Sequence, residues 1–256
     1  EILNKEFYGH ETIKNHLLQI LCQYYTNPES NNILGFFGPP GVGKTTLAYI
    51  ISKILKKPLE IINLCGAQDS SYLEGHSFTY EGSKPGKIIS TLIKHKTMNP
   101  IILFDEVDKI SKTEKGIELE NLLINIIDIT QNYNFSDKYF QEITIDLSKI
   151  LFIFSYNNPN NLNPILKDRI FQIDLDDYNH NDKLNIATQF LIPNILSQFS
   201  ITHNHIIFNK TAISYIINNH CSNETGVRKL KQIIYNVISK IHTIYITNNN
   251  NIIDIN

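Results

Sequence analysis

Residues 38–45 fit the pattern G-x-x-x-x-G-K-[ST], which forms a phosphate-binding loop when it lies between a buried strand and a helix. An apolar run over 33–37 precedes the pattern, and helical periodicity follows it. The loop and its first following residue are Gly38, Pro39, Pro40, Gly41, Val42, Gly43, Lys44, Thr45 and Thr46. The sequence therefore predicts a nucleotide-binding loop in a parallel α/β fold.

The residue types of this loop suit ATP or ADP with Mg²⁺. Glycines allow the backbone amides to turn toward the phosphates, and the start of the following helix adds partial positive charge. We expect the Lys44 ammonium to contact the β- and γ-phosphates and the Thr45 hydroxyl to bind Mg²⁺.

The first part of the chain alternates short apolar runs with helical patterns, as parallel sheets do. The expected strands cover 33–37, 59–64, 101–104, 150–154 and 170–175, and the expected helices 13–25, 45–55, 87–94 and 117–129. The prediction is a P-loop NTPase fold with a five-stranded parallel sheet and helices on both faces, over residues 1–177.

The pattern changes near residue 179. Three helices are expected over 183–191, 211–219 and 227–246, with no convincing strand among them. Residues 178–256 are therefore predicted to form a small all-α lid domain.

Polar residues follow two of the expected strands. Asp105 and Glu106 end the run at 101–104, and Asn157 follows the run at 150–154. The carboxyl ends of parallel strands face the ligand, so Asp105 is a candidate to bind Mg²⁺ and Glu106 to polarise the attacking water. Asn157 either contacts the γ-phosphate or that water, or is a turn residue in a chain rich in asparagine.

Only two of the 23 basic residues are arginines, Arg169 and Arg228. Lysine cannot reproduce the planar, bidentate contact of a guanidinium with phosphate oxygens. Arg169 lies just before the fifth expected strand, where it can reach the site of a neighbouring subunit, and Arg228 begins the last long helix. Both are candidate phosphate contacts, and the alternative is two surface arginines.

Composition excludes several classes of function. The net charge of −2 gives no general attraction to nucleic acid or to anionic membranes. Cys22, Cys65 and Cys221 are scattered, which favours reduced thiols inside a cell. No apolar run is long enough to span a membrane. Residues 203–205 read His-Asn-His without further ligands, so no metal beyond the nucleotide's Mg²⁺ is expected.

Taken together, these residues resemble the AAA+ ATPases and, more narrowly, the ATPase module of ATP-dependent Lon proteases. The resemblance runs from Tyr8-Gly9 to about Thr247. The stretches that carry it are 38–46, Gly75-His76, Thr79-Tyr80, 84–89, Asn99-Pro100, 105–109, 135–137, 146–149, 183–187 and 224–228.

The resemblance implies a role for each candidate residue. The implied roles are Walker A for Lys44 and Thr45, Walker B for Asp105 and Glu106, sensor 1 for Asn157, arginine finger for Arg169, sensor 2 for Arg228, adenine pocket for Tyr8, Gly9 and Tyr178, and substrate grip in a central pore for Tyr80. Glu81 departs from the family, which usually has an aliphatic residue there, so gripping is expected to differ. A loop tyrosine packed on its own domain is the alternative for Tyr80.

The resemblance also implies an assembly and a setting. Lon-type modules form rings, usually hexamers, that unfold damaged proteins and thread them to a Ser-Lys protease domain. No segment here matches that domain, so we expect this chain to be part of a longer protease. The implied location is intracellular, in the cytoplasm or the mitochondrial matrix, with a role in protein quality control.

Two other kinds of function stay open. One is a remodelling ATPase, either of the helicase or clamp-loader type acting on nucleic acid or an unfoldase without a protease. The near-neutral charge argues against nucleic acid, although Lon proteins can bind DNA. The other is a nucleotide-binding scaffold that no longer hydrolyses ATP. The presence of Glu106, Asn157, Arg169 and Arg228 argues against a scaffold.

Overall fold

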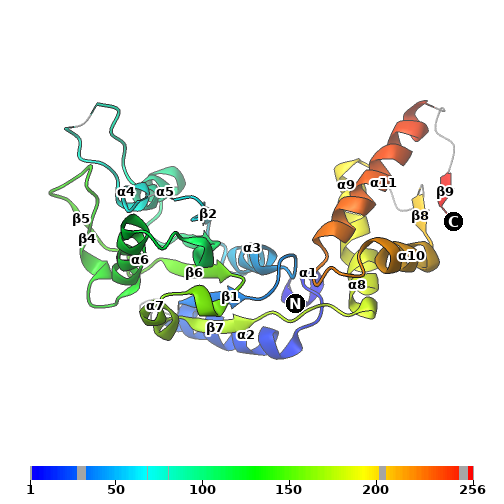
Figure 1. Ribbon diagram of the computed structural model, residues 1–256, viewed down its shortest axis with the longest axis horizontal. Helices are drawn as coiled ribbons and strands as arrows, with labels where there is room; N and C mark the ends of the chain where they lie inside the picture. The colour runs from blue at the N-terminus through cyan, green and yellow to red at the C-terminus, as the bar shows by residue number, and fades with distance from the viewer. Residues whose placement is uncertain are drawn as a thin grey trace. The chain divides into compact units, whose positions relative to one another are not determined.

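The chain divides into two compact units in a computed structural model that describes residues 2–27, 33–67, 69–79, 81–201, 206–247 and 253–255 (Figure 1). The α/β unit comprises residues 11–38 and 44–175. The helical unit comprises residues up to 10, residues 39–43, and the chain from 176 onward. The domain boundary after residue 177 stays a prediction. In the structure, the segment up to residue 10 and the loop 39–43 also belong with the helical unit.

A five-stranded parallel sheet forms the centre of the α/β unit, as the sequence predicts. Its order is β2-β3-β6-β1-β7, and each neighbouring pair is parallel. The strands are β1 (Leu34–Phe37), β2 (Leu59–Asn63), β3 (Ile101–Asp105), β6 (Leu151–Tyr156) and β7 (Phe171–Asp174). β3, β6 and β1 are neighbours, so their carboxyl ends lie side by side at one edge of the sheet.

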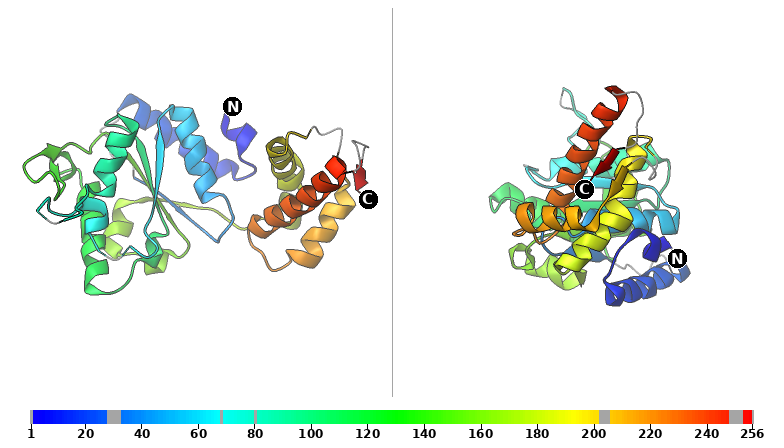
Figure 2. Two further views of the ribbon diagram at one scale, coloured as in Figure 1. Left: turned by 90° about the horizontal axis from the view of Figure 1, so that it is seen from above. Right: turned by 90° about the vertical axis from the view of Figure 1, so that its right-hand side faces the viewer.

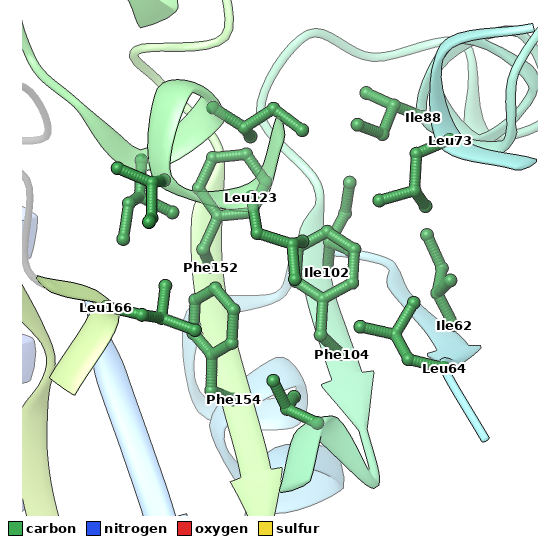
Figure 3. Packing of buried hydrophobic residues seen from close by; sticks show 14 of the residues in the cluster. Ile62, Leu64, Leu73, Ile88, Ile102, Phe104, Leu123, Phe152, Phe154 and Leu166 are labelled. Atoms are coloured by element: carbon green, nitrogen blue, oxygen red, sulfur yellow. The ribbon is translucent and has the colours of Figure 1, made fainter. Parts of the chain in front are cut away.

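Alternation of side chains along the strands gives the sheet two apolar faces. The helices of this unit are α2 (Glu11–Thr26), α3 (Lys44–Leu55), α4 (Ser71–Glu74), α5 (Lys87–His95), α6 (Glu114–Ile127) and α7 (Pro164–Arg169). On one face Phe104, Phe152 and Phe154 pack against residues of α4 to α7, including Leu123 and Leu166 (Figure 3). α3 contacts β2 and β6 and contributes nothing to that cluster, so it covers the opposite face.

Two loops of the α/β unit are joined by a buried carboxylate. A short hairpin of β4 (Phe135–Ser136) and β5 (Thr144–Ile145), which the sequence did not indicate, lies beside the segment between α4 and α5 (Figure 1). Asp137 of the hairpin is fully buried and accepts the Gly86 amide at 2.8 Å. Burial raises the pKa of Asp137. The hairpin thereby fixes the base of the loop that carries Glu81.

The helical unit is a bundle with its own core (Figure 2). Its helices are α1 (Ile2–Glu6), α8 (His180–Ile186), α9 (Ile192–Gln198), α10 (Lys210–His220) and α11 (Arg228–Thr247), with a π-helical turn over Ala187–Leu191. Leu230, Ile234 and Ile238 of α11 are fully buried, as their helical spacing predicts. In the described part of the chain, no helix combines the length and the apolar character needed to cross a membrane.

The helical lid also contains one short pair of strands that the sequence did not indicate. β8 (Ile206–Phe208) pairs in parallel with β9 (Ile253–Ile255). Each strand has three residues, which is too short for alternation to distinguish it from a loop, and the partner strand follows only after two further helices.

Glu60 of β2 contacts three basic side chains. It is buried, and its carboxylate oxygens lie 2.7 Å from Lys94 Nζ, 3.0 Å from His95 Nε2 and 3.5 Å from Lys87 Nζ. Burial alone would raise the pKa of Glu60, but hydrogen bonds from Lys94 and His95 outweigh it and lower the pKa below the ordinary 4.5. A carboxylate with a depressed pKa stabilises the fold while it is ionised.

We therefore expect Glu60→Gln to destabilise the protein at neutral pH by about 1–2 kcal/mol, because the charged hydrogen bonds are lost but the lysines are partly screened by water. The difference should shrink as pH falls below 4.5 through the depressed pKa, since the wild-type carboxylate is then protonated too. Urea unfolding at several pH values measures this, with exposed Glu142→Gln as the control. A difference independent of pH would contradict it.

Candidate functional site

The phosphate-binding loop leaves the α/β unit at a position that accepts only glycine. Gly38 follows β1 with φ at +140°, and a Cβ there would lie 2.3 Å from the Leu175 carbonyl oxygen. Leu175 in turn donates its amide to the Phe37 carbonyl at 2.8 Å. The chain therefore turns sharply at the end of β1. It re-enters the α/β unit at Lys44, the first residue of α3.

Lys44 lies among the groups that the sequence singles out. Its ammonium donates to Asn157 Oδ1 at 2.8 Å and to the Gly38 carbonyl at 2.5 Å. Burial lowers the pKa of Lys44, and the carboxylates of Asp105, Asp108 and Glu106 oppose that shift without cancelling it. The structure thus brings the loop lysine and the candidate sensor asparagine into direct contact.

Asp105 is oriented by a residue of the neighbouring strand. Its Oδ1 atom accepts the Ser155 hydroxyl at 2.7 Å and the Glu106 amide at 3.1 Å. Its other carboxylate oxygen has no hydrogen-bond partner in the described part of the chain. A carboxylate oxygen of this kind is the hard donor type that Mg²⁺ prefers. In this type of site it binds the ion together with the Ser or Thr hydroxyl of the loop, here Thr45.

Glu106 has an unusual backbone conformation. It lies in the left-handed region with φ 59° and ψ 41°, which costs a non-glycine residue about 1–3 kcal/mol. Its carboxylate forms an ion pair with Lys109 at 2.5 Å. The Lys109 hydrogen bond is the main cause that lowers the pKa of Glu106. An ionised carboxylate held in a strained conformation at a strand end is typical of a catalytic position.

Asp108 fixes the main chain of the sensor segment. Its Oδ2 atom accepts the amides of Asn157 and Asn158, each at 3.1 Å. Its Oδ1 atom is buried and has no hydrogen-bond partner among the described residues. Asn157 is therefore held at its backbone by Asp108 and at its side chain by Lys44, which distinguishes it from an ordinary turn residue.

The sequence analysis missed three residues of this group, namely Ser155, Asp108 and Lys109. Asp108 and Lys109 lie in a short 3₁₀ helix (Val107–Lys109), where a carboxylate three residues after Asp105 was the available signal. Ser155 gave no signal. Its proximity to Asp105 follows from pairing of β3 with β6, which are not consecutive strands.

Within the helical unit, loop residues 39–43 are bound by the segment before α11. The Gly41 carbonyl accepts the Val227 amide at 3.1 Å, and the Val42 carbonyl accepts the Tyr178 hydroxyl at 2.9 Å. A Cβ at Gly226 would lie 2.4 Å from Gly41 C and 2.5 Å from Pro40 O. The Gly41 and Val42 carbonyls are thus both bound within the helical unit, which fixes the backbone of this part of the loop.

The predicted adenine-pocket residues lie in the same unit. Tyr8 accepts a hydrogen bond from Asn185 Nδ2 at 2.8 Å, and Gly9 has φ +69°. The next residue, His10, stacks edge-on to Tyr178 with ring centroids 5.3 Å apart. Tyr178 is thus in contact with a residue two positions after Tyr8. The contact of Tyr8, Gly9 and Tyr178 with adenine stays a prediction.

Arg228 begins α11 beside the loop. A Cβ added to Gly41 would lie 3.1 Å from Arg228 Cβ. Glu224 caps this helix, because its carboxylate accepts the amides of Lys229 and Leu230. Pro40, Glu224 and Arg228 help to line one cavity of about 570 Å³ within the helical unit. Arg228 is therefore close to the loop, as its predicted role requires.

The remaining candidates lie apart from this group or outside the described residues. Arg169 ends α7, and its hydrogen bonds in the described part of the chain go to Asp128 and the Ile124 carbonyl. Glu81 and Thr46 are exposed. Tyr80 and residues 203–205 are not among the described residues. No group of three or more His, Cys, Asp or Glu side chains suited to a metal occurs within the part that is described.

Comparison with known proteins identifies the class. Residues 34–175 match the family described as "ATPase family associated with various cellular activities (AAA)". The match covers more than half of the chain and includes the loop, the acidic pair and Asn157. The chain belongs to the AAA family of ATPases.

Its relatives narrow this class. A Lon protease homolog of Acanthamoeba polyphaga mimivirus is 40% identical over 242 residues, which is 94% of this chain and 24% of that protein. The mitochondrial Lon protease homolog of Drosophila melanogaster is 37% identical over 242 residues, and the Lon protease of Malacoplasma penetrans 36% over 240. The chain spans 23% and 30% of their lengths, respectively. Nearly the whole chain corresponds to the AAA+ module of Lon proteases.

We expect Ser155→Ala to raise the Mg²⁺ concentration needed for half-maximal ATPase activity roughly tenfold or more, because Asp105 loses the hydroxyl that orients it. A titration of activity against Mg²⁺ at saturating ATP measures the shift. Ser148→Ala, a change in a turn remote from the acidic pair in sequence, serves as the control. An unchanged Mg²⁺ requirement would show that Ser155 does not act through Asp105.

We expect Gly226→Ala to weaken ATP binding, because the new Cβ overlaps the backbone of Pro40 and Gly41. Such overpacking costs about 1–3 kcal/mol, equivalent to roughly 5- to 150-fold in affinity if the loop gives way. Fluorescent-nucleotide titration measures the loss. The control is Gly82→Ala, whose Cβ meets nothing within 4 Å and whose backbone strain, at φ +78°, lies outside the phosphate-binding loop. Equal affinity of both variants would exclude this role of Gly226.

Proposed function

We propose that this chain binds ATP with Mg²⁺ at the loop 38–45 and hydrolyses it, and that hydrolysis drives the unfolding and threading of proteins by a Lon-type protease. The observation that carries the proposal is the contact of Lys44 with Asn157, next to the strand that ends in Asp105 and Glu106. Such a group has the charges that a triphosphate and an attacking water need.

Each residue has a proposed part in the reaction. Lys44 contacts the β- and γ-phosphates. Thr45 and Asp105 would hold the Mg²⁺ ion, which would supply charge neutralisation for the phosphate oxygens. Glu106 polarises the attacking water, and Asn157 orients it or the γ-phosphate. Arg228 contacts the phosphates from the helical unit, and Tyr8, Gly9 and Tyr178 contact the adenine. ADP then leaves and ATP replaces it.

We further propose that Arg169 acts on the site of a neighbouring copy of the same protein in a ring, with six copies as the expected number. An arginine supplied from outside a site can accelerate phosphoryl transfer by several orders of magnitude. The relatives that are Lon protease homologs support protein substrates and support a protease as the enzyme that this module drives. Tyr80 and Glu81 would then contact the threaded polypeptide.

An intracellular location follows from the same names. Two of the relatives are described as mitochondrial, and others come from bacteria. We expect the cytoplasm or the mitochondrial matrix. No observation favours nucleic acid as the principal substrate, and the net charge of −2 gives no general attraction to it.

The decisive experiment measures ATP hydrolysis over a range of protein concentrations. We expect the rate per subunit to rise with concentration, because Arg169 reaches its neighbour only after assembly. Arg169→Lys should abolish the rise and leave nucleotide binding unchanged, since lysine keeps the charge but not the bidentate contact. Glu106→Gln should bind ATP without turnover.

The outcomes separate the alternatives. ATP binding without turnover in the wild-type protein would favour a nucleotide-binding scaffold. A rate of ATP hydrolysis per subunit that does not depend on protein concentration would contradict the proposed assembly into a ring. Adding an unfolded protein such as casein to the same assay tests threading. A motor that acts on proteins is expected to hydrolyse ATP faster when a protein substrate is present. Single-stranded DNA should not produce this increase.

A further inference from the structure

The guanidinium of Arg169 is held along one side only. Its Nη1 atom lies 2.8 Å from Asp128 Oδ2 and donates to the Ile124 carbonyl at 3.2 Å. Both partners lie at the end of α6, and Arg169 itself ends α7. The Nε and Nη2 atoms have no hydrogen-bond partner in the described part of the chain, and the side chain is 36% exposed.

The free side of this guanidinium has a defined chemistry. Arginine carries five N–H donors in a planar fork, and the contacts with Asp128 and Ile124 use those on Nη1. The donors on Nε and Nη2 point along the other edge of the plane, and two parallel donors of this kind match two oxygens of a phosphate. A side-on bidentate ion pair between Asp128 and Arg169 would have used the Nε–Nη2 edge. The observed pair uses Nη1 alone.

Asp128 is itself immobilised. Its Oδ1 atom accepts the amide of Thr130 at 2.9 Å and the Thr130 hydroxyl at 2.6 Å. These hydrogen bonds from Thr130, together with Arg169, hold the pKa of Asp128 below its usual range. One carboxylate oxygen therefore fixes the side chain to its own turn, and the other is left for Arg169.

We propose that Asp128 is the positioning residue of Arg169: it binds one side of the guanidinium so that the Nε–Nη2 edge is presented to the γ-phosphate of ATP in a neighbouring copy. The proposal rests on the proposed function, in which Arg169 acts between subunits. Asp128 touches no substrate and acts through Arg169 alone. The simpler alternative is that the ion pair only ties α7 to α6.

A double-mutant cycle separates these two roles. Asp128→Asn, Arg169→Ala and the double variant are compared by kcat and KM for ATP at a protein concentration that saturates assembly. We expect Asp128→Asn alone to lower kcat roughly 10- to 100-fold with little change in KM, since a misplaced catalytic group loses rate rather than ground-state binding. In the Arg169→Ala background the same change should alter kcat less than about twofold.

Asp146→Asn is the matched control. Asp146 accepts the Ser148 amide at 2.8 Å in a turn of the same kind but has no arginine partner in the described part of the chain. This variant should keep the wild-type kcat. Thermal unfolding of every variant identifies any that lose activity by losing the fold.

Each other outcome is informative. If Asp128→Asn lowers kcat by the same factor with and without Arg169, Asp128 acts through the fold and this inference is wrong, while the proposed function stands. If Arg169→Ala leaves kcat unchanged, the intersubunit role of Arg169 fails, and the inference fails with it. A wild-type protein without ATPase activity would refute the proposed function itself.

Discussion

Parallel pairing of β1 with β6, and of β6 with β3, places three polar strand ends side by side. Gly38, Asn157 and Asp105 follow or end these strands, and the Lys44 ammonium binds Gly38 and Asn157. The apolar cluster of Phe104, Phe152 and Phe154 fixes the strands below them. The polar atoms therefore occupy defined positions without help from a ligand, which is the condition for electrostatic preorganisation.

Three carboxylates of the α/β unit bind other groups of the protein. Asp108 holds the amides of the sensor segment, Asp128 holds a guanidinium, and Asp137 holds a loop amide. Each accepts two or three hydrogen bonds from other protein groups. Charged hydrogen bonds of this kind are stronger than neutral ones and more directional. They set the geometry of the residues that do the chemistry.

The sequence predicted the five strands and the chemistry-bearing strand ends, because local periodicity and motif spacing carry that information. It did not predict the hairpin that contains Asp137 or the pairing of β8 with β9, whose strands are too short to show alternation. Ser155 and Asp128 were also missed. Their importance depends on which strand or helix end lies next to Asp105 or Arg169, and strand order is a property of the tertiary fold. Glu106 was predicted by motif, but its left-handed backbone was not.

That backbone conformation has an evolutionary consequence. Left-handed dihedrals at residue 106 suit glycine, so a chain selected only for a stable fold would tend to lose the glutamate. Retaining it sets stability against activity at a single position. Random mutagenesis scored by folding alone should therefore favour glycine at this site, whereas selection for turnover should oppose it. If the two selections favour different residues in this way, Glu106 is retained for its role in catalysis and not for the stability of the fold.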